Sequence, residues 1–242
     1  MDLEAIREVY RSGRVVLVNK PLNWTSFDVV NKIRWHLTRA LKIKKIKVGH
    51  AGTLDPLADG LLIICIGRAT KMIEAIQDAP KTYIADVGLG ATTPSYDLET
   101  DVDQEFPIDH ITRDMVVTTL RQFKGEQMQM PPVFSAKKVN GKPAYEYARK
   151  QQEVELRAKS VFFHEIDLQE FEPKQVKVRI KCSKGTYIRS FAHDLGQQLS
   201  SGGYLRGLTR TAIGQFTLDD AWSLNEYIEK INDLNKYKVG EL

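Results

Sequence analysis

The chain has 242 residues, of which 42% are hydrophobic and 27% charged, so it can bury a sizeable core and is not a disordered protein. Lysine and arginine number 35 against 31 acidic residues, a net charge of +4 that permits a nucleic-acid partner without demanding one. The two cysteines, Cys65 and Cys182, form no CxxC pair, which argues against a zinc site and predicts buried thiols in a reducing compartment. The N-terminus has no apolar signal core, and the longest apolar run, Leu61 to Ile66, is too short to span a bilayer. We therefore expect a soluble, cytoplasmic protein without a membrane partner.

The first elements expected along the chain are a strand and a helix. The β-branched run from Arg14 to Asn19 is typical of a strand. Ser26 is a residue type that caps helices, and apolar side chains follow it at helical spacing, at Val30, Ile33 and Leu37. The segment from Lys32 to Lys47 carries seven Lys or Arg residues and no acid. That bias fits either a solvated helix face or a contact with nucleic acid.

The middle of the chain alternates between apolar and acidic segments. Residues 61–67 read as a fully buried strand, 70–79 as a short helix and 81–90 as an alternating strand. The acidic, turn-rich segment from Ala91 to His110 has no apolar periodicity and is expected to be a mobile loop. A helix is expected from Ile111 to Phe123.

The last third of the chain predicts a hairpin, two long strands and a helix. Asn140-Gly141 is typical of a tight hairpin turn. Strands are expected at 161–171 and 176–182, and the second alternates apolar residues with Lys177, Arg179 and Lys181. Strands and helices mix without a regular βαβ repeat, which favours an α+β class over a doubly wound one.

One carboxylate stands out in "VGHAGTLDPLADG", which frames Asp55 between a leucine and a proline with glycines on both sides. An aspartate before proline is commonly a turn residue bonded to its own backbone. The alternative is a nucleophile that forms a covalent intermediate at a sugar or base carbon. In an apolar pocket it would need a cationic partner, and Arg189 in "GTYIRS" could bind it through two hydrogen bonds.

Two aromatic residues could serve the same chemistry. Tyr83 is either a half-buried strand residue or a platform on which a base stacks, with a hydroxyl able to relay a proton. His50 is either an ordinary loop residue or a flat ring that fills the gap left when a nucleotide leaves its stack. Signatures of dinucleotide binding, a phosphate loop, an HExxH metal site and a GxSxG nucleophile elbow are absent from the sequence.

Several motifs in order resemble the TruB family of tRNA pseudouridine synthases. "GHAGTLDPLADGLLIICIGRATK" resembles its catalytic motif, and "VNKPLNWTSFDVVNKIR" its N-terminal motif. The likeness continues through "KTYIADVGLGATTPSYDLET", "PPVFSAKKVNGKPAYEYAR", "VKVRIKCSKGTYIRSFAHDLG" and "YLRGLTRTAIGQFTLDDAW". It therefore spans roughly residues 15–224, and six ordered motifs are far more specific than any one of them.

The resemblance implies a pseudouridine synthase fold: a mixed, mainly antiparallel sheet flanked by helices and loops, with a central catalytic cleft. It implies an isomerase that converts the T-loop uridine at tRNA position 55 to pseudouridine by base flipping, with Asp55 as nucleophile. Tyr83 would be the stacking tyrosine and Arg189 the partner of the carboxylate. Tyr187 and either Leu208 or Leu205 would line the uracil pocket, and Lys20, followed by Pro21, would support the site.

The reaction is an isomerisation without net redox change, so we expect no cofactor and no metal. The expected partner is tRNA, held at its T-arm by segment 32–47 and by the strand face of Lys177, Arg179 and Lys181. We expect a monomer with a catalytic domain over residues 1–224 and a short tail over 225–242, because about eighteen residues are too few for the PUA domain that many family members carry.

Two other functions fit the same residues. An RNA-guided synthase of the dyskerin type shares the aspartate motif but normally has a PUA domain. A non-catalytic tRNA-binding or RNA-folding module would use the same basic surface without the chemistry of Asp55.

Overall fold

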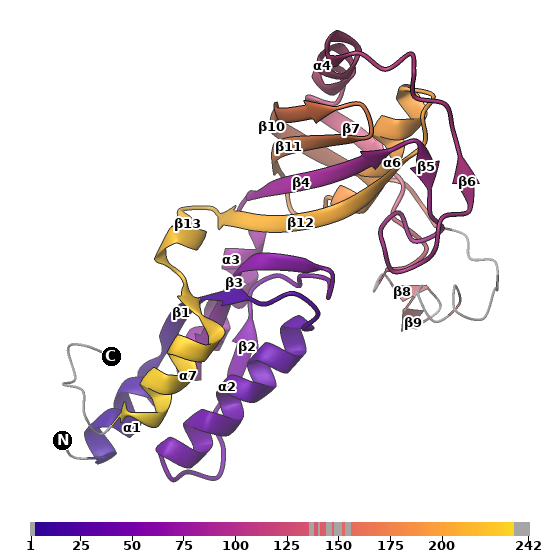
Figure 1. Cartoon of the computed structure of the whole chain (residues 1–242). Helices are drawn as coiled ribbons and strands as arrows, with labels where there is room; N and C mark the ends of the chain where they lie inside the picture. The colour runs from indigo at the N-terminus through magenta and orange to yellow at the C-terminus, as the bar shows by residue number, and fades with distance from the viewer. Residues whose placement is uncertain are drawn as a thin grey trace. The chain divides into compact units, whose positions relative to one another are not determined.

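The computed structural model describes residues 3–135, 138–139, 141–143, 147, 152 and 156–234. The chain forms two units, one built from Met1–Lys81 with Thr209–Leu242 and the other from Thr82–Leu208. We call these unit 1 and unit 2 (Figure 1). Unit 2 is thus inserted in the sequence between the two parts of unit 1. Strand β12, residues Gly203–Ile213, contains residues of both.

Unit 1 is a small sheet with helices on it. Its strands follow the order β14-β1-β3-β12, with β2 paired to β3 and β13 to β12. The pairs β1–β3 and β2–β3 are antiparallel, and β1–β14 is parallel. Its elements are α1 (Leu3–Ser12), β1 (Arg14–Lys20), α2 (Ser26–Ala40), β2 (Val48–His50), β3 (Ala58–Ile66), η1 (Gly67–Met72), α3 (Ile73–Asp78), β13 (Phe216–Thr217), η2 (Leu218–Asp220), β14 (Trp222–Ser223) and α7 (Leu224–Asn232).

Strand β3 is the centre of the unit 1 core because both of its faces are buried. Leu62, Ile64 and Ile66 belong to a cluster with helices α1, α2 and α7. The alternate residues Leu61, Ile63 and Cys65 belong to a second cluster. A strand buried on both faces needs a continuous apolar run, which confirms the interpretation of this segment.

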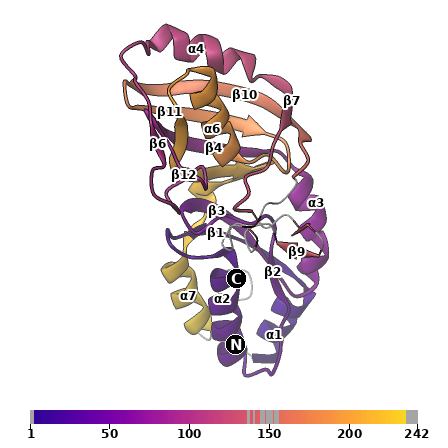
Figure 2. The ribbon, with the colours of Figure 1, turned by 90° about the vertical axis from the view of Figure 1, so that its right-hand side faces the viewer.

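Helix α7 packs beside α2 in unit 1 (Figure 2). Its residues Leu224, Tyr227, Ile228 and Ile231 are buried in the same cluster as the apolar face of α2. The segment expected as a short tail therefore begins with a helix that completes this core. Residues 235–242 lie outside the described part.

Unit 2 is built on a second run of strands, in the order β12-β4-β11-β10-β7, with α4 and α6 packed on it (Figure 1). Its remaining elements are β4 (Lys81–Leu89), β5 (Ala91–Thr92), β6 (Gln104–Glu105), α4 (Arg113–Gln122), β7 (Gly125–Gln129), β8 (Lys138–Val139), β9 (Lys142–Pro143), β10 (Lys159–Glu172), β11 (Gln175–Cys182) and α6 (Ile188–Gln198). Phe123, Phe163 and Phe191 meet in its core, with ring centroids 5.0 to 6.3 Å apart. Aromatic rings at such separations add to the stabilisation from burial.

Several expectations are confirmed here. The fold is a mixed, mainly antiparallel sheet with helices, as the α+β class requires. β8 and β9 pair with Val139 opposite Lys142, which is the predicted hairpin. Every second residue of β11 is buried, from Val176 to Cys182. Among the described helices none is both long and apolar enough to cross a membrane.

The acidic segment 91–110 is more structured than a mobile loop would be. It contains the paired strands β5 and β6, with Ala91 opposite Glu105. Thr93, Ser95 and Asp97 are buried within it. The hydroxyls of Thr93 and Ser95 both donate to the Asp97 carbonyl, at 2.7 and 3.1 Å. These side-chain hydrogen bonds order the segment although its sequence has no apolar periodicity.

Candidate active site

The loop that carries Asp55 joins β2 to β3 in unit 1. Its backbone is bonded at both sides of the aspartate: the Asn23 N–H donates to the Pro56 carbonyl at 2.8 Å, and the Ala58 N–H to the Asp55 carbonyl at 3.1 Å. Leu54 is buried, whereas Asp55 is half-buried. The loop therefore anchors on an apolar neighbour and leaves its carboxylate within reach of solvent or substrate.

Ser26 fixes the loop one residue before the aspartate. Its hydroxyl accepts from the Leu54 N–H at 2.9 Å and donates to the Leu54 carbonyl at 3.1 Å. The prediction that Ser26 caps the following helix is wrong by one position. Thr25 is the N-cap, in a reciprocal capping box with Asp28. Ser26 is thereby freed to point at the Asp55 loop.

Arg210 holds the other side of the loop from strand β12. Its side chain is 1% exposed, and its guanidinium donates to the carbonyls of Gly52 at 3.0 Å, Thr53 at 3.3 Å and Leu61 at 2.8 Å. Thr209–Leu242 belongs to unit 1, so all of these contacts lie within one unit. One side chain thus connects the residues just before Asp55 to the strand just after it.

A glycine makes this approach possible. Gly60 has φ +97°, and a Cβ on it would lie 2.4 Å from the Arg210 carbonyl oxygen. Any other residue would push β12 away from β3 and Arg210 away from the loop.

Lys20 is a second buried cation beside the loop. It is 0% exposed, and its ammonium donates to the carbonyls of Pro21 at 2.9 Å and Trp24 at 2.7 Å. Burial lowers the pKa of Lys20 to about 8, an effect opposed by the negative charges of Asp59 and Asp55. Lys20 and Asp55 therefore interact electrostatically, which agrees with the supporting position that the sequence suggests for this lysine.

His50 lies at the end of β2, before the loop, and is half-buried. Burial lowers the pKa of His50, and the positive charge of Arg210 lowers it further. Its Nδ1 is buried without a hydrogen-bond partner among the described residues. Both effects disfavour the charged form of the ring, and its contact with a base stays a prediction.

The other predicted site residues belong to unit 2. Arg189 is 6% exposed on α6, donates to the Phe134 carbonyl at 2.7 Å, and lies 3.6 Å from the carboxylate of Asp97. Asp97 is a functional candidate that sequence reasoning missed, because one aspartate among many acids carries no distinguishing signal. The predicted pair of Arg189 with Asp55 joins residues of different units and stays a prediction.

Tyr83 is buried at the start of β4, and Tyr187 is the N-cap of α6. The side-chain amide of Gln129 exchanges two hydrogen bonds with the Tyr187 backbone, at 2.8 and 3.0 Å. Of the two candidate leucines, Leu205 is 5% exposed and its N–H is bonded to the Tyr96 carbonyl, whereas Leu208 is half-buried. Which of the two leucines lines the uracil pocket stays a prediction.

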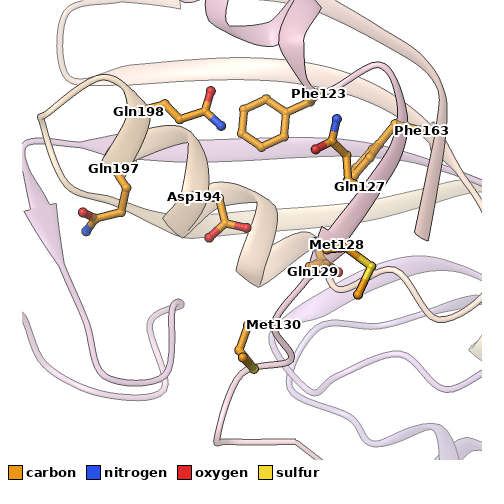
Figure 3. A pocket seen from close by; sticks show the side chains of 9 residues that line it. All are labelled: Phe123, Gln127, Met128, Gln129, Met130, Phe163, Asp194, Gln197 and Gln198. Carbon is orange, nitrogen blue, oxygen red and sulfur yellow. The ribbon is translucent and has the colours of Figure 1, made fainter. Parts of the chain in front are cut away.

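Unit 2 also contains a cavity of about 340 Å³ between α6 and the strands β7 and β10 (Figure 3). Phe123 and Phe163 form an apolar wall and Asp194 lies across from them. Burial raises the pKa of Asp194 to about 6. Neither Tyr83 nor Arg189 lines this cavity in the described part of the chain.

The basic face of β11 is not the open cationic surface that the sequence indicated. Arg179 and Lys181 both bind Glu165 on β10, at 2.8 and 3.0 Å, and Lys177 binds Glu170 at 2.7 Å. Hydrogen bonds from Arg179 and Lys181 lower the pKa of Glu165 to about 2. The neighbouring strand therefore partly compensates the charge of the three residues, and their contact with RNA stays a prediction.

Comparison with known proteins places this geometry in a family. Residues 38–188, more than half of the chain, match the family described as TruB family pseudouridylate synthase (N terminal domain). The chain is 54% identical to a tRNA pseudouridine synthase B of Phocaeicola vulgatus, over 91% of this chain and 94% of the relative. It is also 54% identical to the protein of that name in Parabacteroides distasonis, over 95% and 97%.

A solved structure shares the fold. A chain in the crystal structure of a Cbf5-Nop10-Gar1 complex superposes with a TM-score of 0.72 at 26% identity, over 97% of this chain. This chain spans 59% of the length of that one. With the family match over most of its length and relatives at 54% identity, the chain belongs to the TruB family of pseudouridylate synthases.

Proposed function

We propose that this protein isomerises a uridine of tRNA to pseudouridine, at position 55 of the T-loop in tRNA numbering, with Asp55 as nucleophile. The observation that carries the proposal is the fixed position of Asp55. Its loop is held by Ser26 on one side and by Arg210 on the other, and Asp55 is half-buried. Membership of the TruB family and relatives named tRNA pseudouridine synthase B support the substrate.

The reaction breaks the bond from N1 of uracil to C1′ of the ribose, turns the base, and joins C5 to C1′. C5 then loses its proton and N1 gains one, so the product is an isomer of the substrate. The carboxylate of Asp55 adds to the base or captures the ribose carbon, and leaves again when the new bond forms. Atoms balance without an oxidant or reductant. The loop must hold the carboxylate still during both steps, since small displacements of a reacting group cost large factors in rate.

The detached uracil must be kept from diffusing away, which requires an apolar pocket with an aromatic wall. We assign this role to Tyr83, Tyr187 and Leu208 of unit 2. His50 of unit 1 is assigned to the gap that the flipped nucleotide leaves, because its surroundings lower its pKa and so favour a ring that stacks without adding charge. Arg189 is proposed as the cation that pairs with Asp55, in addition to its contact with Asp97.

Mapping of pseudouridine in an unmodified tRNA transcript, incubated with the purified protein and no guide RNA, tests the function. Modification at position 55 is expected. Asp55→Asn should abolish single-turnover conversion and leave tRNA affinity within about twofold, because phosphate contacts dominate binding. Asp114→Asn, an exposed aspartate at the start of α4, is the matched control and should keep the full rate.

Modification at another position would contradict the substrate assignment. Conversion only with an added guide RNA would favour the RNA-guided alternative. Retention of turnover by Asp55→Asn would remove the nucleophile assignment.

A further inference from the structure

The cationic side chains of segment 32–47 differ in whether they already interact with other groups of unit 1. In helix α2, Arg34 donates to the Val48 carbonyl at 2.9 Å, and the Arg39 guanidinium lies 4.1 Å from the centre of the Trp35 ring. These two side chains already have partners within unit 1. The lysines that follow the helix are all exposed: Lys42, Lys44, Lys45 and Lys47. The unsatisfied positive charge of this segment therefore lies after α2.

Two of these lysines line a hollow in the surface of unit 1. The hollow has a volume of about 260 Å³. Five of its eight lining residues are Lys or Arg and none is acidic. We call it the basic hollow; its polar wall consists of Arg11, Lys45, Lys47, Arg68, Lys71 and Thr70.

Backbone geometry brings the three segments of the basic hollow together. Gly67, which begins η1, has φ +62°, and its N–H donates to the Lys47 carbonyl at 2.8 Å. A Cβ on Gly67 would lie 2.1 Å from the Tyr10 carbonyl oxygen, so this glycine lets η1 approach the end of α1. The Thr70 hydroxyl donates to the Gly67 carbonyl at 2.8 Å and closes the turn. The hollow is therefore a defined feature of the fold and not a chance gathering of long side chains.

The charge of the basic hollow is largely uncompensated. Arg11 pairs with Glu4 at 2.9 Å. Within the described residues the ion pairs found involve none of Lys45, Lys47, Arg68 and Lys71. Four lysine and arginine side chains on adjoining segments, beside the apolar floor that their stems and Ile46 form, suit a phosphate group, whose oxygens accept several charge-assisted hydrogen bonds.

The basic hollow is remote from the reacting carboxylate. β3 runs from Ala58, beside the Asp55 loop, to Ile66, beside Gly67. With a rise of about 3.3 Å per residue, and some shortening at Gly60, the hollow lies roughly 25 Å from Asp55. A phosphate bound there belongs to a nucleotide well away from the one whose base is turned over.

We propose that the basic hollow binds a backbone phosphate of the tRNA roughly 25 Å from the modified uridine, a contact that fixes how the substrate lies on unit 1. The inference rests on the proposed function for the identity of the RNA. The binding itself can be measured apart from turnover. Within the described part of the chain, the lysines and Arg68 of the basic hollow lack the acidic partners that the cations of β11 have on β10, so the basic hollow is the better candidate of the two for a phosphate contact.

The test removes two charges from the wall with Lys45→Gln and Lys71→Gln in one protein. Binding of unmodified tRNA is measured by fluorescence anisotropy over a salt titration. The variant should bind roughly tenfold more weakly at ~100 mM salt, and the slope of log affinity against log salt should fall by about 1 to 2. Both lysines are exposed, so the melting curve by circular dichroism should not change.

The matched control is Arg121→Gln with Lys124→Gln, which removes two exposed charges near the end of α4 in unit 2 and should leave affinity within twofold. A T-loop hairpin with a stem too short to extend about 25 Å from the target uridine should bind both proteins alike. Unchanged affinity for whole tRNA, or an equal loss with the short hairpin, overturns the proposal. Absence of pseudouridine formation together with the expected loss of binding would refute the proposed function and leave the basic hollow standing.

Discussion

Replacing Arg210 with methionine should separate the positioning of Asp55 from the binding of RNA. Methionine keeps an apolar stem of similar length and removes the guanidinium, with its bonds to the carbonyls of Gly52, Thr53 and Leu61. A hydrogen bond from a charged donor contributes about 1.5–3 kcal/mol, and a buried acceptor left without a partner costs about 1–3 kcal/mol.

The three carbonyls will not respond equally. Leu61 is 0% exposed, so its carbonyl cannot be rehydrated, and its loss should cost about 2 kcal/mol. Gly52 is half-buried and Thr53 exposed, so water can replace much of the lost contact, at about 0.5 kcal/mol each. We therefore expect Arg210→Met to lower the free energy of unfolding by about 3 kcal/mol.

The effect on catalysis should be larger than the effect on binding. A displacement of the Asp55 loop by about 1 Å should lower kcat by roughly 10- to 100-fold, with the Kd for tRNA within about twofold. Single-turnover rates at saturating enzyme, below the melting temperature of the variant, measure kcat on folded protein. Arg210→Lys keeps the charge but not the fork of donors, so it should recover only part of the rate.

Arg206→Met is the matched control, since Arg206 lies four residues earlier on β12 and is exposed. It should change neither stability nor kcat appreciably. The reasoning is refuted if Arg210→Met keeps the wild-type kcat, or if its only defect is weaker tRNA binding.

Three further predictions test the surroundings of the site. Ser26→Ala removes both hydrogen bonds to Leu54 and should lower the free energy of unfolding, measured in urea, by about 1–2 kcal/mol. In single-turnover assays it should lower kcat without raising the Kd for tRNA. An unchanged kcat would mean that Arg210 alone holds the loop. Gly60→Ala should destabilise the protein by about 2 kcal/mol or more because the added Cβ meets the β12 backbone. Gly207→Ala is the control, since its Cβ would make only an ordinary contact at 3.6 Å and should be nearly neutral. Equal melting temperatures of the two variants would contradict the close approach of β12 to Gly60. Burial raises the pKa of Asp194 to about 6. Between about pH 4 and 6 the folded protein therefore binds a proton at this residue that the unfolded chain does not bind. The stability that this proton contributes is lost as the pH rises through about 6. Asp194→Asn should therefore melt higher than wild type at pH 7 and lose that advantage near pH 4, and a constant difference across this range would refute the shift.

Local patterns in the sequence predicted much of the fold. The buried strand β3, the alternation of β11 and the hairpin of β8 and β9 all follow from side-chain periodicity or turn chemistry over a few residues. The start of α2 was predicted one residue late. Thr25 and Asp28 together satisfy more backbone donors than Ser26 alone could, so the capping box decides where the helix begins.

Long-range charge pairing was beyond such patterns. The three cations of β11 look like an open cationic face in the sequence. β10 brings Glu165 beside Arg179 and Lys181 and Glu170 beside Lys177, in a register that cannot be read from β11 itself. For Arg210 the local sequence predicts exposure, whereas the structure buries the side chain. Between two threonines on a strand it looks like an exposed residue, and only the approach of β3 at Gly60 makes it buried.

The division of the chain has a consequence for its synthesis. All residues of unit 2 leave the ribosome before the second part of unit 1, and the cluster that buries the apolar face of α2 is incomplete until α7 has been made. Until then that cluster lacks Leu224, Tyr227, Ile228 and Ile231. Nascent chains stalled before Leu224 should therefore expose part of this apolar cluster and depend on chaperones, even when unit 2 has already folded.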